Sequence, residues 1–191
     1  MNYHHKITTV LAALVMSTAL NAQEVNDGTF SIEIDPATYA FNGYALHLKK
    51  SFKALPKWEF GLGTYSMDFP DALVNMSPEN RDKGWGQRLD KGFGFFVDYF
   101  FKENQEGLFT GIQLAHQEYD IERNGASSEY TTFLAMGYVG YQYEFYNSFY
   151  VKPWIGLGHN TQVSGSNKVN GMVFEVPSII VFPTVHVGYK F

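Results

Sequence analysis

The sequence predicts an all-β protein, an eight-stranded antiparallel up-and-down transmembrane β-barrel. Eight segments alternate apolar and polar residues with the two-residue period of a β-strand. The connections between these segments are short and long in turn, as in barrels that cross a membrane. The last segment ends the chain on an aromatic residue, with Val185, Tyr189 and Phe191 on one face and His186 and Lys190 on the other.

Each strand is recognised by its alternation and by the turn residues beside it. In the first strand, Phe30 and Ile32 alternate with Ser31 and Glu33, and a turn at residues 35–38 follows. The later strands repeat the pattern between glycine-, asparagine- and proline-containing connections. The predicted strands are residues 28–34, 39–50, 57–68, 91–102, 108–121, 130–145, 149–161 and 172–191.

The connections indicate which end of the barrel faces which side. If the last strand ends in the periplasm at Phe191, counting backwards places three turns on the periplasmic side and three longer loops outside. The turns are residues 51–56, 103–107 and 146–148, and the loops are 69–90, 122–129 and 162–171. Short inner turns, long outer loops and an even number of strands are typical of transmembrane barrels. The connection at 35–38 is unusually short for an outer one.

The N-terminus predicts export. Residues 1–22 are expected to form a cleaved signal peptide, which leaves residues 23–191 as the outer-membrane barrel domain. A basic tip precedes an apolar run from Ile7 to Leu20, and small and polar residues lead to Ala22. The run is shorter than the about 20 residues of a spanning helix, although a retained membrane anchor is the alternative. No later apolar run reaches about 18 residues, so any spanning must be done by strands.

Composition excludes several classes of protein. The chain has no cysteine, so it has no disulfide framework and no thiol for lipid attachment. Its net charge of −5 is not gathered into blocks, and nucleic-acid binding is not expected. No phosphate loop, dinucleotide fingerprint or zinc-finger spacing occurs, so no cofactor is predicted.

The apolar face of the strands is predicted to contact lipid, and the polar face to line the lumen. A soluble lipocalin-like barrel would show the same alternation with its apolar face inward. The polar face, however, carries Glu33, Lys49, Glu59, Asp98 and Lys152, among other charges. Because side chains just fill an eight-stranded lumen, we expect these charges to pair as a polar plug. A narrow proton or ion path is the functional alternative.

Two further groups of side chains follow from this orientation. His47 and His186 would face the lumen, where Glu59 or Asp98 could join them around a metal ion. No His-x-His or His-x₃-His spacing supports such a site, so no metal is predicted. Aromatic residues near the inner turns would form an interfacial girdle: Phe52, Trp58, Phe101, Phe109, Phe145, Phe149, Tyr189 and Phe191.

The aromatic closing strand resembles that of bacterial outer-membrane barrels, whose terminal Phe is read by the barrel assembly machinery. The whole chain resembles the small-barrel class that includes OmpA-like, OmpW-like and lipid A deacylase barrels. This resemblance implies a monomer in the outer membrane of a Gram-negative cell envelope. It also implies contact with outer-membrane lipid and lipopolysaccharide, and recognition of Phe191 during assembly.

A local resemblance concerns His159-Asn160-Thr161 at the outer end of the seventh strand. It is similar to the His-x-Ser of the lipid A 3-O-deacylases, in which the His acts as base, the Ser as nucleophile and a Glu orients the His. Thr161 stands where that family has Ser. Val173 stands where it has Glu, with Glu175 two residues further on. The resemblance implies an ester hydrolase that would use His159, Thr161 and Glu175.

The favoured function is non-catalytic, with a structural or surface-binding role through the extracellular loops. Such loops would bind lipopolysaccharide, a surface partner or an apolar solute. In loop 69–90 the candidate binding residues are Arg81, Lys83, Trp85 and Arg88, because cations can contact lipopolysaccharide phosphates. The alternatives are the deacylase-like hydrolase and a soluble periplasmic lipocalin-like carrier. Specificity would lie in the loops, so the sequence does not name a ligand.

Overall fold

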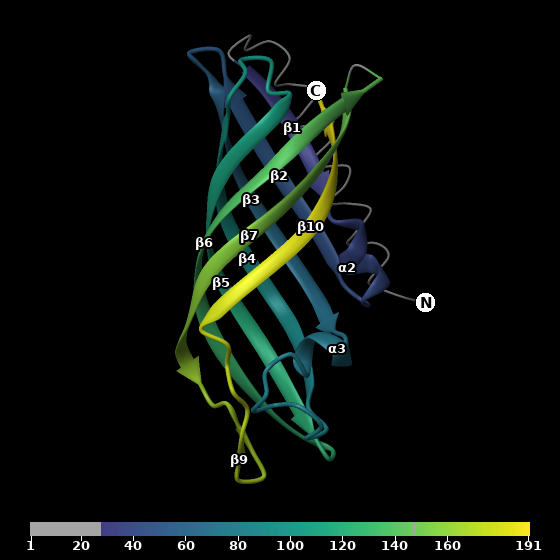
Figure 1. Ribbon diagram of the computed structural model, residues 1–191, viewed down its shortest axis with the longest axis vertical. Helices are drawn as coiled ribbons and strands as arrows, with labels where there is room; N and C mark the ends of the chain where they lie inside the picture. Colours follow the sequence, from purple (N-terminus) through teal and green to yellow (C-terminus); the bar gives the residue numbers. More distant parts are fainter. Residues whose placement is uncertain (1–27, 147) are drawn as a thin grey trace, which may run out of the picture.

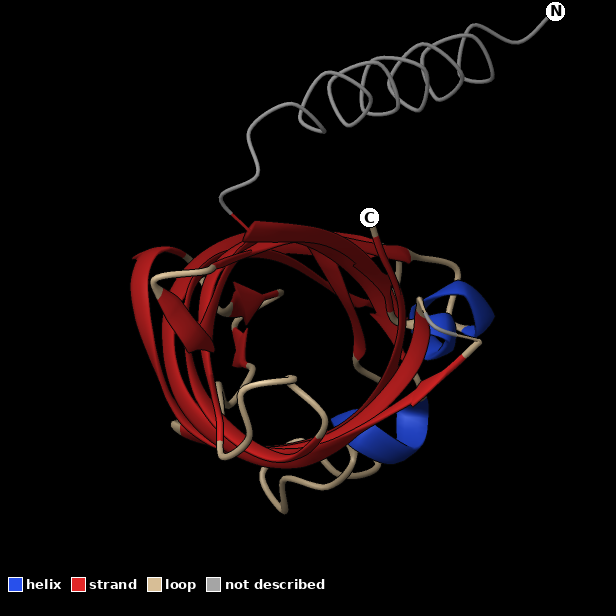
Figure 2. Ribbon diagram, turned by 90° about the horizontal axis from the view of Figure 1, so that it is seen from above, coloured by secondary structure: helices blue, strands red, loops and turns tan. Residues whose placement is uncertain are grey.

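A closed ring of eight antiparallel strands forms the body of the molecule (Figures 1 and 2). The computed structural model describes residues 28–146 and 148–191, so the predicted signal peptide lies outside the described residues. The order around the ring is β1-β10-β7-β6-β5-β4-β3-β2, which confirms the predicted up-and-down barrel. The barrel strands are β1 (Gly28–Ile34), β2 (Tyr44–Phe52), β3 (Leu55–Phe69), β4 (Gly86–Phe100), β5 (Gly107–Arg123), β6 (Ala126–Phe145), β7 (Phe149–Gly165) and β10 (Ile179–Lys190).

The connections contain four short elements: α2 (Pro36–Ala40), α3 (Asp71–Val74), β8 (Lys168–Val169) and β9 (Met172–Val173). Figure 2 shows both helices at the perimeter of the ring of strands. Within the described part of the chain, neither helix is long and apolar enough to cross a bilayer.

Two strands begin later than predicted. The second strand begins at Tyr44 and not at residue 39, because residues 36–40 form α2. The Asp35 side chain caps this helix by accepting a 2.9 Å hydrogen bond from the Ala37 backbone N–H, and Pro36 fits the first turn. The last strand begins at Ile179 and not at Met172. Residues 172–173 pair with β8 in a hairpin, whose turn residues Asn170 and Gly171 adopt positive φ.

Several strands extend beyond the predicted limits at the end that the sequence predicts to face outside, which we call the outer end, so the loops there are shorter than expected. β5 and β6 pair as far as Arg123 and Ala126, and only Asn124 and Gly125 form the turn between them. Both turn residues have positive φ, as a tight two-residue hairpin turn requires. The polar ends of these strands therefore continue the barrel past its apolar band.

The apolar faces point outward, as predicted. Ile112 and Leu157 are more than half exposed, whereas Glu33 and Asp98 are fully buried in the lumen. An outer face this rich in exposed apolar side chains is not that of a soluble carrier. One predicted girdle residue is wrong: Phe109 is fully buried and points into the barrel, because the outward position of β5 at this level belongs to Leu108.

The outer mouth of the barrel is covered by loop side chains. An apolar cluster joins the strands to the outer loops and includes Val74, Trp85, Val169 and Phe174, which we call the outer lid. Two loops are tied to each other through Asn80, whose side chain exchanges two 2.8 Å hydrogen bonds with the backbone of Glu175. The lumen is therefore closed by packed side chains at its outer end.

Candidate functional site in the barrel lumen

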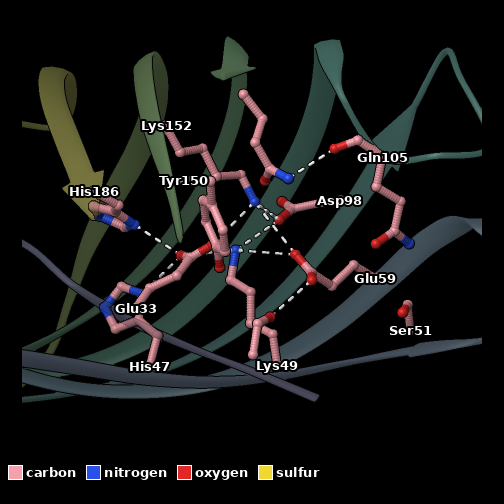
Figure 3. Close-up of polar contacts among 12 residues, drawn as sticks. Glu33, His47, Lys49, Ser51, Glu59, Asp98, Gln105, Tyr150, Lys152 and His186 are labelled. Carbon is pink, nitrogen blue, oxygen red and sulfur yellow. Dashed lines mark hydrogen bonds and ion pairs between the residues drawn. The ribbon is translucent and has the colours of Figure 1, made fainter. Parts of the chain in front are cut away.

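Five charged side chains meet across the inner half of the lumen (Figure 3). They come from inward positions of five different strands and are at most 3% exposed. We call them the ionic layer: Glu33 on β1, Lys49 on β2, Glu59 on β3, Asp98 on β4 and Lys152 on β7.

Each lysine of the ionic layer binds all three carboxylates. The Lys152 ammonium lies 2.6 Å from Asp98, 3.2 Å from Glu33 and 3.3 Å from Glu59. The Lys49 ammonium lies 2.6, 3.1 and 3.8 Å from Asp98, Glu33 and Glu59 in turn. The predicted pairing of the interior charges is confirmed.

Neutral donors complete the ionic layer. Tyr150 donates a 2.9 Å hydrogen bond to Glu33, Ser31 donates a 3.0 Å bond to Glu59, and Tyr138 donates to Asp98. Three carboxylates facing two ammonium groups leave one negative charge in excess, and such neutral donors stabilise it. The layer is a satisfied network, which closes the lumen at this level.

Two histidines lie on the outer side of the ionic layer. His186 Nδ1 is 3.0 Å from a Glu33 oxygen, and His47 Nδ1 is 3.9 Å from the same oxygen. His47 Nδ1 is buried and has no hydrogen-bond partner among the described residues. The ligand atoms of Glu33, His47 and His186 lie within 4.8 Å of one another, so the structure groups the histidines with Glu33 and not with Glu59 or Asp98. The two ammonium groups already bound to Glu33 would repel a cation there.

A cavity of about 110 Å³ lies between this histidine pair and the outer lid. This is several times the space that one water molecule needs. Its wall is mostly carbon, with Ala45, Leu134, Met136 and Trp154 among the lining residues. Such a wall, with few polar groups, is typical of sites that bind apolar small molecules.

Most polar groups around the cavity bond to one another. Gln113 and Gln117 both donate to the Tyr65 hydroxyl, at 3.0 and 3.2 Å, and Tyr119 donates to Gln117 at 3.1 Å. His47 lines the cavity, and its Nδ1, which lies 3.9 Å from Glu33, has no hydrogen-bond partner among the described residues, so the His47 imidazole is the lining group we select for hydrogen bonding to a ligand.

The cavity was not predicted, although the sequence contains a signal for it. In the outer half of several strands the inward positions are apolar as well as the outward ones. Leu134 and Met136 on β6 and Phe182 on β10 are examples. Where the inward residues of a strand become apolar like the outward ones, the lumen changes from polar to apolar at that level.

The residues of the predicted hydrolase are not linked. His159 and Thr161 lie at outward positions of β7, and both are exposed. Glu175 lies in the segment before β10, where its backbone bonds to Asn80. None of the hydrogen bonds among the described residues joins two of these three side chains, and their catalytic role stays a prediction.

The predicted binding residues of loop 69–90 have different environments. Arg81 is exposed and donates to the Asn75 carbonyl at 3.2 Å, and Lys83 is half-buried. Trp85 is buried in the outer lid, with its ring 5.4 Å from that of Phe174. Arg88 belongs to β4, where its guanidinium bonds to Asp68 and Ser66. A binding role for these residues stays a prediction.

Comparison with known proteins identifies the fold. No family model and no curated protein matches the chain. The N-terminal β-barrel domain of Pseudomonas aeruginosa OprF has a TM-score of 0.51 and 12% identity, covering 87% of this chain and 98% of that domain. Neisserial surface protein A (NspA) has a TM-score of 0.46 and 12% identity, covering 86% of this chain and 92% of that one. The likeness to the OprF domain, together with the apolar outer face, shows a small eight-stranded β-barrel of the outer-membrane type.

Proposed function

We propose that this outer-membrane β-barrel is a non-catalytic binding protein that holds a slim apolar molecule in the outer half of its lumen. The cavity between the histidine pair and the outer lid carries this proposal. Its wall is mostly apolar and includes His47, whose Nδ1 has no hydrogen-bond partner among the described residues. Each methylene that moves from water to such a wall contributes about 0.8 kcal/mol, and a chain that comes from the bilayer would instead be held by its fit to the wall and by a hydrogen bond from its head.

The arrangement of the lumen supports binding over conduction. The ionic layer fills the barrel below the cavity with paired charges. Further toward the inner end, Gln105 accepts a 2.7 Å hydrogen bond from Gln142 and donates bonds of 3.1 and 3.4 Å to the Pro56 and Trp58 carbonyls. A solute in the cavity therefore has no open path to the periplasmic end.

The chemistry of the cavity favours a ligand with an unbranched hydrocarbon chain and a small head that can hydrogen-bond. The chain would lie against Leu134, Met136 and Trp154, and the head would reach His47. A fatty acid is the simplest molecule with both features, and we use it as the probe.

Trp154 can report on occupancy, because it lines the cavity. The Trp58→Phe/Trp85→Phe variant leaves Trp154 as the single tryptophan. In vesicles containing this variant, a fatty acid brominated on its chain should quench Trp154 fluorescence with saturation, and the unbrominated acid should reverse the quenching. Quenching that never saturates, or that ordinary fatty acid does not reverse, would refute binding in the lumen.

A matched pair of substitutions separates the cavity from the lipid surface. Ala45 lines the cavity, so Ala45→Phe should fill part of it and abolish the saturable quenching. Ala135 is exposed on the outer face of β6, so Ala135→Phe should leave the quenching unchanged. Equal behaviour of the two variants would contradict the proposal.

The barrel surface supports two partner proposals. Arg81 is exposed and Lys83 is half-buried in the loop after β3, and these cations would contact lipopolysaccharide phosphates. Phe191 is 56% exposed, while its backbone N–H bonds to the Phe30 carbonyl at 2.8 Å. The assembly machinery would bind this aromatic side chain.

A further inference from the structure

The barrel wall has a seam where two strands lack a strand partner. β1 pairs with β10 only over Ser31–Ile34 and Val187–Lys190. From Ile179 to His186, β10 is paired with β7 on one side, and no strand of the described residues pairs with it on the other. Across the seam, Tyr44 to Leu46 of β2 pair with β3 and with no other strand in the part of the chain that the structure describes. The wall is therefore a continuous sheet in its inner half and interrupted in its outer half.

Helix α2 fills this seam. It follows directly after β1 and lies against β2, β3 and β10 (Figure 1). From Pro36 to Leu46 the chain carries no charged residue, and Tyr39 and Tyr44 are exposed. This outward surface is compatible with lipid. The neighbouring outward residues of β10, such as Val181 and Val185, are exposed and apolar as well, which places the seam within the apolar band.

The cavity extends to the inner side of the seam. Asp35 and Thr38 contribute to its lining from the α2 segment, and Ile180 and Phe182 contribute from the unpaired part of β10. Only α2 and the side chains beside it thus separate the cavity from the outer surface here.

The attachment of α2 is uneven. On the β3 side, Asn42 donates a 2.9 Å hydrogen bond to Asp68, and the Phe41 carbonyl accepts a 2.8 Å bond from the Asp68 backbone N–H. On the β10 side, the only hydrogen bond between residues 35–43 and β10, among the described residues, runs from the Thr184 hydroxyl to Asp35 at 2.6 Å. The α2–β10 contact is therefore the weaker side of the seam.

We infer that α2 is a movable plug over a lateral passage between β10 and β2, through which an alkyl chain moves between the outer leaflet and the lumen cavity. The inference rests on the proposed binding function and adds the route and the source of the ligand, which is the membrane. When the bond between Thr184 and Asp35 breaks, α2 can swing away while its β3-side contacts hold. The opening faces lipid, so an acyl chain enters without crossing water.

A reversible disulfide cross-link tests the passage. The chain has no cysteine of its own, so the two introduced cysteines have no other thiol in the chain to pair with. In the single-Trp154 protein, Asp35→Cys and Thr184→Cys replace two side chains that touch, so their disulfide would fasten α2 to β10. The control pair, Leu114→Cys and Ala135→Cys, joins two strands that are already paired on the far wall. Both proteins are placed in vesicles that contain the brominated fatty acid.

The order of loading and locking gives the decisive result. Locking before loading should slow the quenching of Trp154 by roughly tenfold or more relative to the reduced form of the same protein, as expected when a gating motion is blocked, and reduction should bring back the faster rate of that form. Loading before locking should trap the ligand, so that quenching persists after the brominated acid is removed. The control pair should load equally fast when oxidised and reduced.

Each other outcome is informative. If the locked protein loads as fast as the reduced one, the passage is refuted, while the binding function stands with entry through the outer lid. If the reduced protein shows no saturable quenching, the binding function fails and the passage with it.

Should the cysteine pair not form its disulfide, Thr184→Val tests the same contact. Losing a hydrogen bond to a carboxylate should speed loading by roughly tenfold. The control is Thr110→Val, which breaks a hydrogen bond to the Tyr138 carbonyl on the far wall and should leave the loading rate unchanged. Equal loading rates in the two variants would overturn the inference.

Discussion

Replacing Lys152 by methionine tests whether the ionic layer holds the barrel together. The substitution removes an ammonium group that contacts three carboxylates at 2.6–3.3 Å and is 1% exposed. Lys49 would remain as the one cation facing Glu33, Glu59 and Asp98. Breaking a buried pair by removing one partner typically costs about 3–5 kcal/mol, because the remaining charges stay buried without compensation. We expect Lys152→Met to lower the free energy of unfolding by that amount.

Urea unfolding of the refolded barrel in vesicles, followed by tryptophan fluorescence, measures this loss. Lys190→Met is the matched control. Lys190 also lies 2.6 Å from a carboxylate, that of Glu144, but the two side chains are 14% and 26% exposed. Its loss should cost about 1 kcal/mol or less. Combining Lys152→Met with Asp98→Asn removes one charge of each sign and should regain part of the stability. If Lys152→Met costs no more than Lys190→Met, the reasoning about the ionic layer is wrong.

Three further predictions concern charge, conduction and chemistry. Burial and the nearby carboxylates of Glu129 and Glu122 raise the pKa of Asp120, at the outer end of β5 beyond the apolar band. When the pKa of a carboxyl is higher in the folded than in the unfolded state, the folded protein loses stability as the pH rises from the unfolded-state pKa through the folded-state pKa. Asp120→Asn should therefore stabilise the barrel at pH 7 and have little effect below the ordinary Asp value of about 3.9, as urea unfolding at both pH values would show. In planar bilayers the protein should give no single-channel current steps, because the ionic layer closes the lumen; regular steps would contradict a closed plug. Mass spectra of lipid A from cells that express the barrel should be unchanged, and loss of one acyl chain that His159→Ala abolishes would instead establish the hydrolase.

The alternation of the sequence was sufficient to predict the barrel and which face of each strand points outward. Each strand has one face that contacts lipid, so apolar side chains recur at every second residue. Phe93 and Phe95, which alternate with Gly92 and Gly94, are an example. The pairing of the inner charges also followed from the sequence, because an eight-stranded lumen leaves no room for unpaired ones. These predictions depend on local pattern and on barrel size, and both are visible in one sequence.

The seam and α2 could not be predicted from the pattern of one strand, because they depend on a local helix cap and on how distant strands pair. Residues 39–44 place Tyr39, Phe41 and Gly43 on one side, and the pattern there is compatible with a strand. The local cap from Asp35 decides for a helix. The length of β10 without a strand partner depends on the closing register of β1 against residues more than 150 positions away. One sequence signal does exist. Pro183 lies in the part of β10 that has a strand partner on one side only, and proline within a strand is typical of an edge strand.

The ionic layer and the seam belong to one arrangement. β1 is short and pairs with β10 over only four residues, which by itself would be a weak closure of the ring. Glu33 on β1 strengthens it by binding Lys49 on β2, Lys152 on β7 and His186 on β10. The inner half of the closure is thus fastened both by the strand ladder and by buried charge. Because this half holds the ring closed, the outer half of the same closure can be left to α2, which can open to lipid without unfastening the barrel.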